Sequence, residues 1–391
     1  MLHALSIANY RSLLNLTVEV GRLNLIVGAN GSGKSNFYRA LRLLAETAQG
    51  GVVNALAREG GLESTFWAGP EGLQGFPRRM KRGDTPIQGT RSKEPKYLRL
   101  GFTDDDFGYA ITLGLPIPSL SAFTLDPEIK HEVIWAGPVY RPASVLVERQ
   151  GPVIKVRDER EWRVLAPRVG PFDTLFNVVA DPEATPEVFS VREAIRAWRF
   201  YDHFRTDRDA PARQPQLGTR TPVLHHDGRD LAAALQTIRE IGDAALLDRA
   251  IADAFPGASI EIDRQADGRF SVQFHQEGLL RPLSGAELSD GTLRYLLWVA
   301  ALLSPRPPRL MVLNEPETSL HPDLLPALAR LIVQASGVTQ VWVVSHAPGL
   351  IRALEANREC HTLKLEKELG ETRLEGVGRL EGPSWHWASV T

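Results

Sequence analysis

The chain has 391 residues, of which 45 are Lys or Arg and 47 are Asp or Glu, so its net charge is −2. This balance excludes a uniformly basic protein that coats nucleic acid, but it leaves a local basic patch open. Hydrophobic residues make up 43% of the chain, enough for a sizeable core. The single cysteine, Cys360, excludes a disulfide framework, a structural zinc site and a thiolate-held iron–sulfur cluster within the chain, and predicts a cytoplasmic location.

The chain lacks the patterns of a membrane span and of a secretory signal. Its longest apolar run, 295–303, has nine residues, whereas a spanning helix needs about 20. The first 11 residues contain no basic start followed by an apolar stretch. We therefore expect no membrane partner.

The N-terminal part predicts strands and then a helix. Apolar residues alternate along 14–20, and a short apolar strand at 23–27 ends at a glycine-rich turn. Apolar residues at 37, 41, 44, 45 and 48 then fall on one face of a helix. Gly50 and Gly51 end that helix.

The middle of the chain predicts a loop, short strands and then helices. Residues 70–96 are rich in Gly, Pro and Arg, and 78–96 carry seven basic and two acidic residues. Such a loop either holds a nucleic-acid backbone or is simply a solvated loop. Hairpin turns are predicted at 104–106 and 267–268. Arginines alternate with aromatic residues along 194–213, which fits base stacking or a helix with buried aromatic rings.

Residues 28–35, Gly-Ala-Asn-Gly-Ser-Gly-Lys-Ser, match the pattern of a phosphate-binding loop between an apolar strand and an amphipathic helix. Glycines let the backbone N–H groups approach phosphate closely, and the helix N-terminus adds partial positive charge. Lys34 would reach the β and γ phosphates, and Ser35 would ligate Mg²⁺. The predicted nucleotide contacts from this region are Gly28, Asn30, Gly31, Ser32, Gly33, Lys34, Ser35 and Asn36.

An apolar strand at 310–313 ends in Asn314 and Glu315. Ligands of parallel sheets bind at the carboxyl ends of the strands, where Glu315 would polarise an attacking water. Asn314 occupies the position at which an aspartate normally orients a water bound to Mg²⁺. Because its amide is neutral, we expect weaker Mg²⁺ binding or slower turnover.

Two further motifs each allow a structural and a functional interpretation. A strand at 341–344 ends in Ser345 and His346, and His346 would contact the γ-phosphate if the strand lies beside the phosphate loop. Residues 288–292, Leu-Ser-Asp-Gly-Thr, open a buried helix predicted at about 290–303. Taken alone, Ser289 is an ordinary helix N-cap.

In this order, the motifs resemble an ABC-type ATPase head. The segments 7–12, Ile-Ala-Asn-Tyr-Arg-Ser, and 315–322, Glu-Pro-Glu-Thr-Ser-Leu-His-Pro, are similar to RecF, the SMC proteins and above all the bacterial OLD-like ATPases of the AAA-21 type. The resemblance implies an α/β P-loop NTPase with a mixed sheet, an antiparallel β subdomain and an inserted helical lobe. We expect a split core at 1–50 and 284–391, a β part at 51–165 with the basic loop 70–96, and a mainly helical lobe with a closing hairpin at 166–283.

The resemblance also implies ATP and Mg²⁺ as cofactors and an ATP-linked homodimer. Ser289 and Gly291 of one subunit would cap the γ-phosphate held by the other, and Arg11 would approach the nucleotide. Glu315 and His346 are the expected catalytic residues, and Ser35 and Asn314 the expected metal ligands. The expected function is ATP-driven dimerisation, reversed by hydrolysis, that acts on DNA or on an effector such as a nuclease in DNA repair or phage defence.

Three other functions stay open. Asn314 would suit a slow or non-hydrolysing ATP-gated scaffold. The nucleotide-binding subunit of a membrane transporter fits less well, because Lys34 and Ser289 are 255 positions apart, far more than the resemblance leads us to expect for a transporter head. A self-contained nuclease of the OLD type would need a Toprim domain, and the 45 residues after His346 are too few for one.

Overall fold

The computed structural model describes residues 1–69, 95–117, 120–159, 161–179, 181–377, 383 and 385–388. Residues 70–94, and with them nearly all of the predicted basic loop, lie outside this part. Contacts divide the chain into two compact units. The parallel-sheet unit comprises Met1, Val20–Gly28 and Ala197–Lys364, and the antiparallel-sheet unit comprises Leu2–Glu19, Ala29–Arg196 and Leu365–Thr391.

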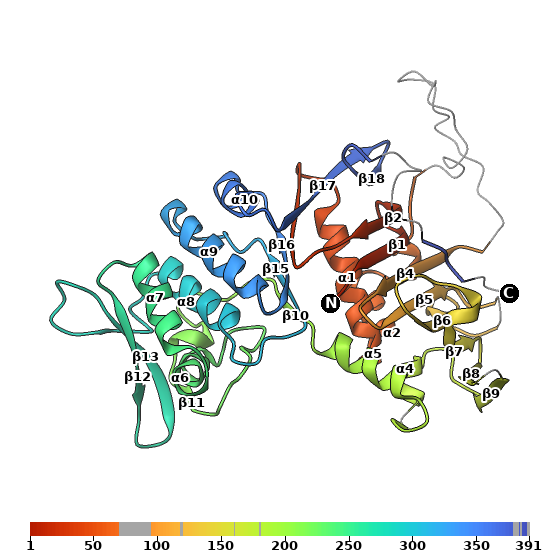
Figure 1. Ribbon diagram of the computed structural model, residues 1–391, viewed down its shortest axis with the longest axis horizontal. Coiled ribbons are helices and arrows are strands. Elements are labelled where there is room, and N and C mark those ends of the chain that lie inside the picture. The colour runs from red at the N-terminus through yellow and green to blue at the C-terminus, as the bar shows by residue number, and fades with distance from the viewer. Residues whose placement is uncertain are drawn as a thin grey trace. The chain divides into compact units, whose positions relative to one another are not determined.

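A six-stranded sheet has the order β10-β15-β16-β3-β17-β18 (Figure 1), and its first four strands are parallel and belong to the parallel-sheet unit. They are β3 (Leu23–Gly28), β10 (Arg199–Tyr201), β15 (Leu310–Asn314) and β16 (Gln340–Val344). β3, β15 and β16 are nearly continuous runs of buried apolar residues, which is typical of parallel strands covered on both faces. The strands predicted at 23–27, 310–313 and 341–344 are confirmed.

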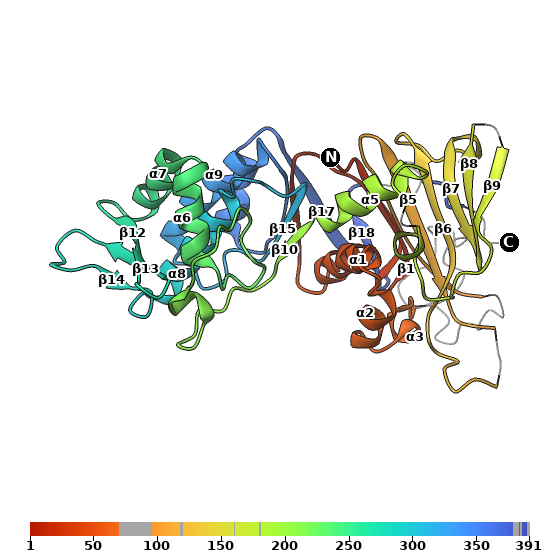
Figure 2. The same cartoon turned by 90° about the horizontal axis from the view of Figure 1, so that it is seen from below.

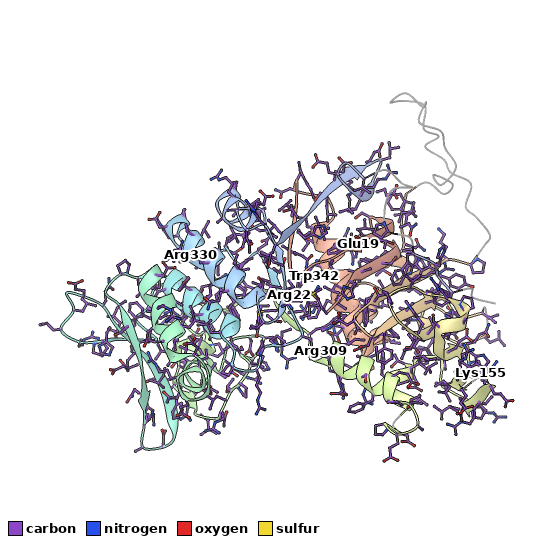
Figure 3. All side chains as sticks on the ribbon, viewed as in Figure 1. Glu19, Arg22, Lys155, Arg309, Arg330 and Trp342 are labelled. Carbon is purple, nitrogen blue, oxygen red and sulfur yellow. The ribbon has the colours of Figure 1, made fainter. Side chains whose placement is uncertain are left out.

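Helices and a β-hairpin complete this unit. α8 is apolar almost all round and buried, as expected of a helix in the middle of a core (Figure 2). Arg330 on α9 donates to both carboxylate oxygens of Asp253 on α7, at 2.9 and 2.8 Å (Figure 3). The helices are α6 (Leu231–Ile241), α7 (Ala244–Ala254), α8 (Asp290–Leu302), α9 (Leu325–Ser336) and α10 (Pro348–Glu355), with the 3-10 turns η3 (Pro211–Arg213) and η4 (Pro322–Leu324).

The hairpin turn predicted at 267–268 joins β12 (Ser259–Arg264) to β13 (Arg269–His275). Gly268 adopts a φ of +81°, a conformation that favours glycine in tight turns. The short strands β11 (Gln216–Leu217) and β14 (Leu283–Ser284) pair with β13.

The aromatic residues near β10 belong to the core. Trp198, Tyr201 and Phe204 are no more than 5% exposed, and Tyr201 and Phe204 both pack edge-on against Trp298 of α8. These three rings are therefore core side chains and are not available to stack on nucleic-acid bases.

The antiparallel-sheet unit contains an eight-stranded sheet in the order β2-β1-β4-β5-β6-β7-β8-β9 (Figure 1). The predicted turn at 104–106 joins β4 to β5, where the Asp104 side chain accepts from the backbone N–H groups of Asp106 and Phe107. The strands are β1 (Ala4–Tyr10), β2 (Leu13–Glu19), β4 (Tyr97–Thr103), β5 (Phe107–Gly114), β6 (Glu128–Ala136), β7 (Val145–Gln150), β8 (Val153–Asp158) and β9 (Glu161–Ala166).

The helices of this unit include the one predicted to follow the phosphate loop. They are α1 (Lys34–Thr47), α2 (Val52–Arg58), α3 (Leu62–Thr65), α4 (Leu175–Val178) and α5 (Pro186–Arg196), with the 3-10 turn η2 (Pro142–Ser144). β17 (Cys360–Glu368) begins in the parallel-sheet unit and ends in this one, where it pairs with β18 (Glu371–Leu374). The sequence-based division into three parts stays a prediction.

Among the described residues, no helix has both the length and the apolar character that crossing a membrane requires.

A fully buried ion pair lies inside the antiparallel-sheet unit. The guanidinium of Arg149 on β7 is 3.4 Å from the carboxylate of Glu132 on β6, and both side chains are completely buried. Glu132 also accepts from the Tyr109 hydroxyl and from the backbone N–H of Leu175, while Arg149 donates to the Gly170 carbonyl. This network fixes the chain at 170–175 against the sheet.

We expect Glu132→Gln to lower the free energy of unfolding by about 3–5 kcal/mol, because it leaves the Arg149 charge buried without its counter-ion. Glu193→Gln is the control, since Glu193 pairs with Arg196 on the exposed face of α5 and should matter little. Urea denaturation measures both, and equal losses in the two variants would contradict this account.

Candidate functional site

Polar residues gather at the carboxyl edge of the parallel sheet because the four parallel strands end within a few residues of one another. Tyr201 of β10 pairs with Leu313 of β15, Asn314 with Val344 of β16, and Val344 with Ile26 of β3. The backbone N–H of Ser345 also donates to the Ile26 carbonyl at 3.2 Å. The residues at these strand ends are Asp202 and His203, Asn314 and Glu315, Ser345 and His346, and Gly28.

The glycine-rich loop continues from Gly28, the last residue of β3. Gly28, Gly31 and Gly33 have φ angles of 153°, 81° and 109°, which side chains rarely allow. A Cβ on Gly33 would lie 2.0 Å from the Thr372 hydroxyl, whereas a Cβ on Gly31 would meet nothing within 4 Å. The loop is therefore closed by β18 at Gly33 and open at Gly31, where Asn30 is also exposed.

α1 begins directly after this loop with an uncapped N-terminus. Gly33 is its N-cap and provides no side-chain hydrogen bond, and no acidic residue lies in the first turn. The partial positive charge of the helix end is therefore available to an anion. Lys34 is buried and its ammonium donates to the Ala29 carbonyl at 3.1 Å, while Ser35 is exposed.

A chain of hydrogen bonds fixes the loop from behind. The Asn36 amide donates to the Ser12 hydroxyl at 2.8 Å, and Ser12 lies 2.7 Å from the Thr372 hydroxyl. Thr372 is 2.8 Å from the Ser32 carbonyl, to which it donates. Asn36, predicted as a nucleotide contact, is thus used to hold the loop, and Ser12 and Thr372 are positioning residues that the sequence did not indicate. The Ser32 hydroxyl is buried and has no hydrogen-bond partner among the described residues.

Arg11, which is also a predicted nucleotide contact, forms an ion pair with the carboxylate of Glu59. It has a φ of 50° and donates to Glu59 at 3.0 and 3.3 Å. Tyr10 donates to the same carboxylate. The guanidinium of Arg11 is therefore held on Glu59.

Glu315 lies on a strained turn at the end of β15. Its φ is 49°, unusual for a residue with a side chain, and its backbone N–H donates to the Val344 carbonyl at 2.8 Å. Its carboxylate is about half exposed and lies 3.5 Å from Nδ1 of His346. The side chain thus faces solvent at the edge of the sheet, as a residue that orients water must.

Glu317 organises the turn that carries His346, a role that the sequence did not indicate. Its Oε1 accepts from the Ser345 hydroxyl at 2.7 Å and from the backbone N–H groups of His346 and Ala347 at 3.0 and 3.2 Å. Nδ1 of His346 is 3.6 Å from the same oxygen. The buried carboxylate of Glu317 and the exposed one of Glu315 therefore flank the imidazole.

The Ser-Asp-Gly segment at the start of α8 is held by a buried arginine. Ser289 is the N-cap, and its hydroxyl accepts from the backbone N–H of Thr292 at 3.1 Å. Arg213 donates to the Leu288 carbonyl and to the Asp290 carboxylate, both at 2.6 Å, and to the Gly285 carbonyl at 3.2 Å. Ser289 is exposed and Gly291 is half-buried at the helix N-terminus. The turn therefore presents Ser289 and Gly291 in a fixed conformation.

The predicted magnesium ligands have suitable donor atoms but little charge. Ser35 offers a hydroxyl oxygen and Asn314 an amide oxygen, both of which are types that Mg²⁺ accepts. Neither group is ionised, so the two together supply less attraction for a divalent cation than a serine and an aspartate would.

The sheet, the glycine loop and the antiparallel β part define an α/β P-loop ATPase of the ABC-type head class. A family model described as "AAA domain, putative AbiEii toxin, Type IV TA system" matches residues 23–352. The chain therefore belongs to this family, AAA_21, of AAA-type ATPase domains, and the resemblance to heads of the SMC and RecF kind is confirmed.

A solved structure of an SMC head is similar to the chain in fold. An SMC head bound to the C-winged helix domain of ScpA has 12% sequence identity and a TM-score of 0.50, over 95% of this chain and 97% of that one. The SMC head domain from Thermotoga maritima has 13% identity and a TM-score of 0.48, over 96% and 99% of the two chains. No curated protein matches the chain.

We expect Glu317→Ala to speed amide hydrogen exchange at His346 and Ala347 about 10-fold or more, because both N–H groups lose their charged acceptor. Glu315→Ala is the matched control, since the Glu315 side chain accepts no hydrogen bond from these amides. Unchanged exchange at 346–347 in Glu317→Ala would contradict the positioning role.

Proposed function

We propose that the chain binds and hydrolyses ATP and that ATP binding joins two chains head to tail. The observation that carries this proposal is the parallel register of β3, β16 and β15, which places Gly28, His346 and Glu315 along one edge of the parallel sheet. Ligands of α/β sheets bind at this edge.

In this proposal the glycine loop holds the phosphates. Backbone N–H groups from Asn30 to Gly33 and the uncapped start of α1 would bind phosphate oxygens. Lys34 would exchange the Ala29 carbonyl for the β and γ phosphates, because an ionised acceptor forms the stronger hydrogen bond. Arg11 would approach the nucleotide by releasing Glu59.

Hydrolysis would depend on the two strand-end residues Glu315 and His346. Glu315 would orient and deprotonate the attacking water, and its exposure keeps it accessible to that water. His346 would donate to the γ-phosphate while Glu317 fixes its backbone. Mg²⁺ bound through Ser35 and Asn314 would offset the charge that develops on the phosphates.

The partner chain would complete each site. Ser289 and Gly291 of one chain would cap the γ-phosphate held by the other, with the N-terminus of α8 directed at the negative charge. Arg213 would keep this turn in its binding conformation.

The ATP cycle would act on DNA or on an effector protein such as a nuclease, in DNA repair or phage defence. The family description, which names a toxin of a toxin–antitoxin system, supports an effector role. The single cysteine suits the cytoplasm as the place of action.

A slow or non-hydrolysing ATP-gated scaffold is the second candidate function. It is favoured by Asn314, whose neutral amide stands where a carboxylate would hold the cation. Phosphate release well above background in the steady state would eliminate it, and Asn314→Asp should raise turnover if charge is what limits the rate.

We expect Lys34→Ala to weaken ATP binding about 10- to 100-fold, because charged hydrogen bonds to phosphate are lost. Glu315→Gln should keep ATP binding and lower turnover about 100-fold or more. Lys155→Ala, on β8 of the antiparallel sheet (Figure 3), is the control and should bind ATP as the native protein does. Native affinity in Lys34→Ala would show that the phosphate loop is wrongly assigned.

ATP-dependent dimerisation is tested by Ser289→Arg, which places a large cation where the γ-phosphate cap should form. In the Glu315→Gln background, ATP should convert monomer to dimer, and the added Ser289→Arg change should prevent this while leaving ATP binding by the monomer intact. Light scattering coupled to size exclusion measures the mass. A dimer that forms equally well without ATP would argue against the proposed cycle.

A further inference from the structure

Asp202 lies beside Asn314 at the carboxyl edge of the sheet. β10 pairs in parallel with β15, with Arg199 opposite Met311 and Tyr201 opposite Leu313. Asp202 directly follows Tyr201, as Asn314 follows Leu313. Neighbouring strands in a sheet are about 4.8 Å apart, so the register places these two residues side by side at the end of the sheet.

Both residues follow a side chain that faces the helical core. Tyr201 packs against Trp298 of α8 and shares the core cluster with Leu313. Successive residues of an extended chain alternate between the two faces of a sheet. The side chains of Asp202 and Asn314 are therefore expected on the other face of the sheet. Ile26 of β3, two residues before Gly28, belongs to the same face.

The Asp202 carboxylate is partly withdrawn from water. Burial raises the pKa of Asp202 to about 6, because removal from water disfavours the charged form. A divalent cation at this edge would favour the charged form further, since it attracts the carboxylate directly.

The other carboxylates of this edge have different positions. Glu317 is fixed by three donors from residues 345–347. Glu315 is exposed on its strained turn beside His346. Asp202 follows β10, and the pairing of β10 with β15 places it next to position 314, where the neutral Asn314 stands.

We propose that Asp202 supplies, from the neighbouring strand, the carboxylate that Asn314 lacks, and that it positions Mg²⁺ or a water bound to it when ATP is present. This inference rests on the proposed function, because it needs a nucleotide at the glycine loop. In this arrangement the cation site still has one negative charge, which lies at the end of β10 and not at the end of the neighbouring strand β15. The neutral side chain of Asn314 therefore does not by itself abolish ATP hydrolysis.

The test measures how Mg²⁺ changes the binding of a fluorescent, non-hydrolysable ATP analogue, with EDTA as the metal-free reference. Asp202→Asn should leave metal-free binding within about 2-fold of native, while the Mg²⁺ concentration that gives half of the enhancement rises about 10-fold or more. Mn²⁺ binding by electron paramagnetic resonance, with the analogue present, should weaken in parallel. Asp207→Asn is the matched control, because Asp207 is exposed and paired with Arg205.

The double variant Asp202→Asn with Asn314→Asp returns the carboxylate to position 314 and should recover most of the Mg²⁺ response. Asp202→Asn should fold at least as stably as native at pH 7, because the folded state no longer holds a carboxylate whose pKa is raised. Native Mg²⁺ dependence in Asp202→Asn, or no recovery in the double variant, overturns the inference. Failure of the native protein to bind the analogue at all would instead overturn the proposed function.

Discussion

The parallel register of four short strands is the constraint on which the candidate site depends. β10, β15, β16 and β3 run in parallel and end within a few residues of one another, so residues far apart in the sequence meet at one edge of one sheet. β15 and β16 are buried on both faces, and a slip in their register would place apolar side chains where polar ones belong. Hydrophobic packing of the sheet therefore determines where Glu315 and His346 lie, and the polar groups are positioned by a core that they do not themselves stabilise.

Buried charged groups fix the conformation of the turns near this edge. Glu317 accepts three hydrogen bonds from residues 345–347, and Arg213 donates to the backbone around 285–290. A buried ion that is fully hydrogen-bonded gives a turn a single conformation, because every alternative leaves the charge unsatisfied. In the antiparallel-sheet unit, Thr372 has the corresponding role for the glycine loop, although it does so with a neutral hydroxyl.

Local patterns predicted much of the fold. The glycine loop, the apolar strands and the hairpin turns each depend on residues close together in the sequence, and the structure has them where the patterns placed them. The positioning residues could not be predicted, because their roles depend on tertiary contacts: Arg213 bonds to a carbonyl 75 residues away and Thr372 to one 340 residues away. β10 has only three residues, too few to show a period, so nothing in the sequence aligned Asp202 with Asn314.

Hydrogen exchange with and without Mg²⁺ and a non-hydrolysable ATP analogue tests most directly the proposal that the nucleotide binds through the glycine loop and the residues that follow β15 and β16. The account predicts slower exchange in three separate segments at once, residues 28–36, 314–318 and 345–348, with the Lys34→Ala variant losing all three effects together. Protection confined to the glycine loop, with no change at the other two segments, would contradict it.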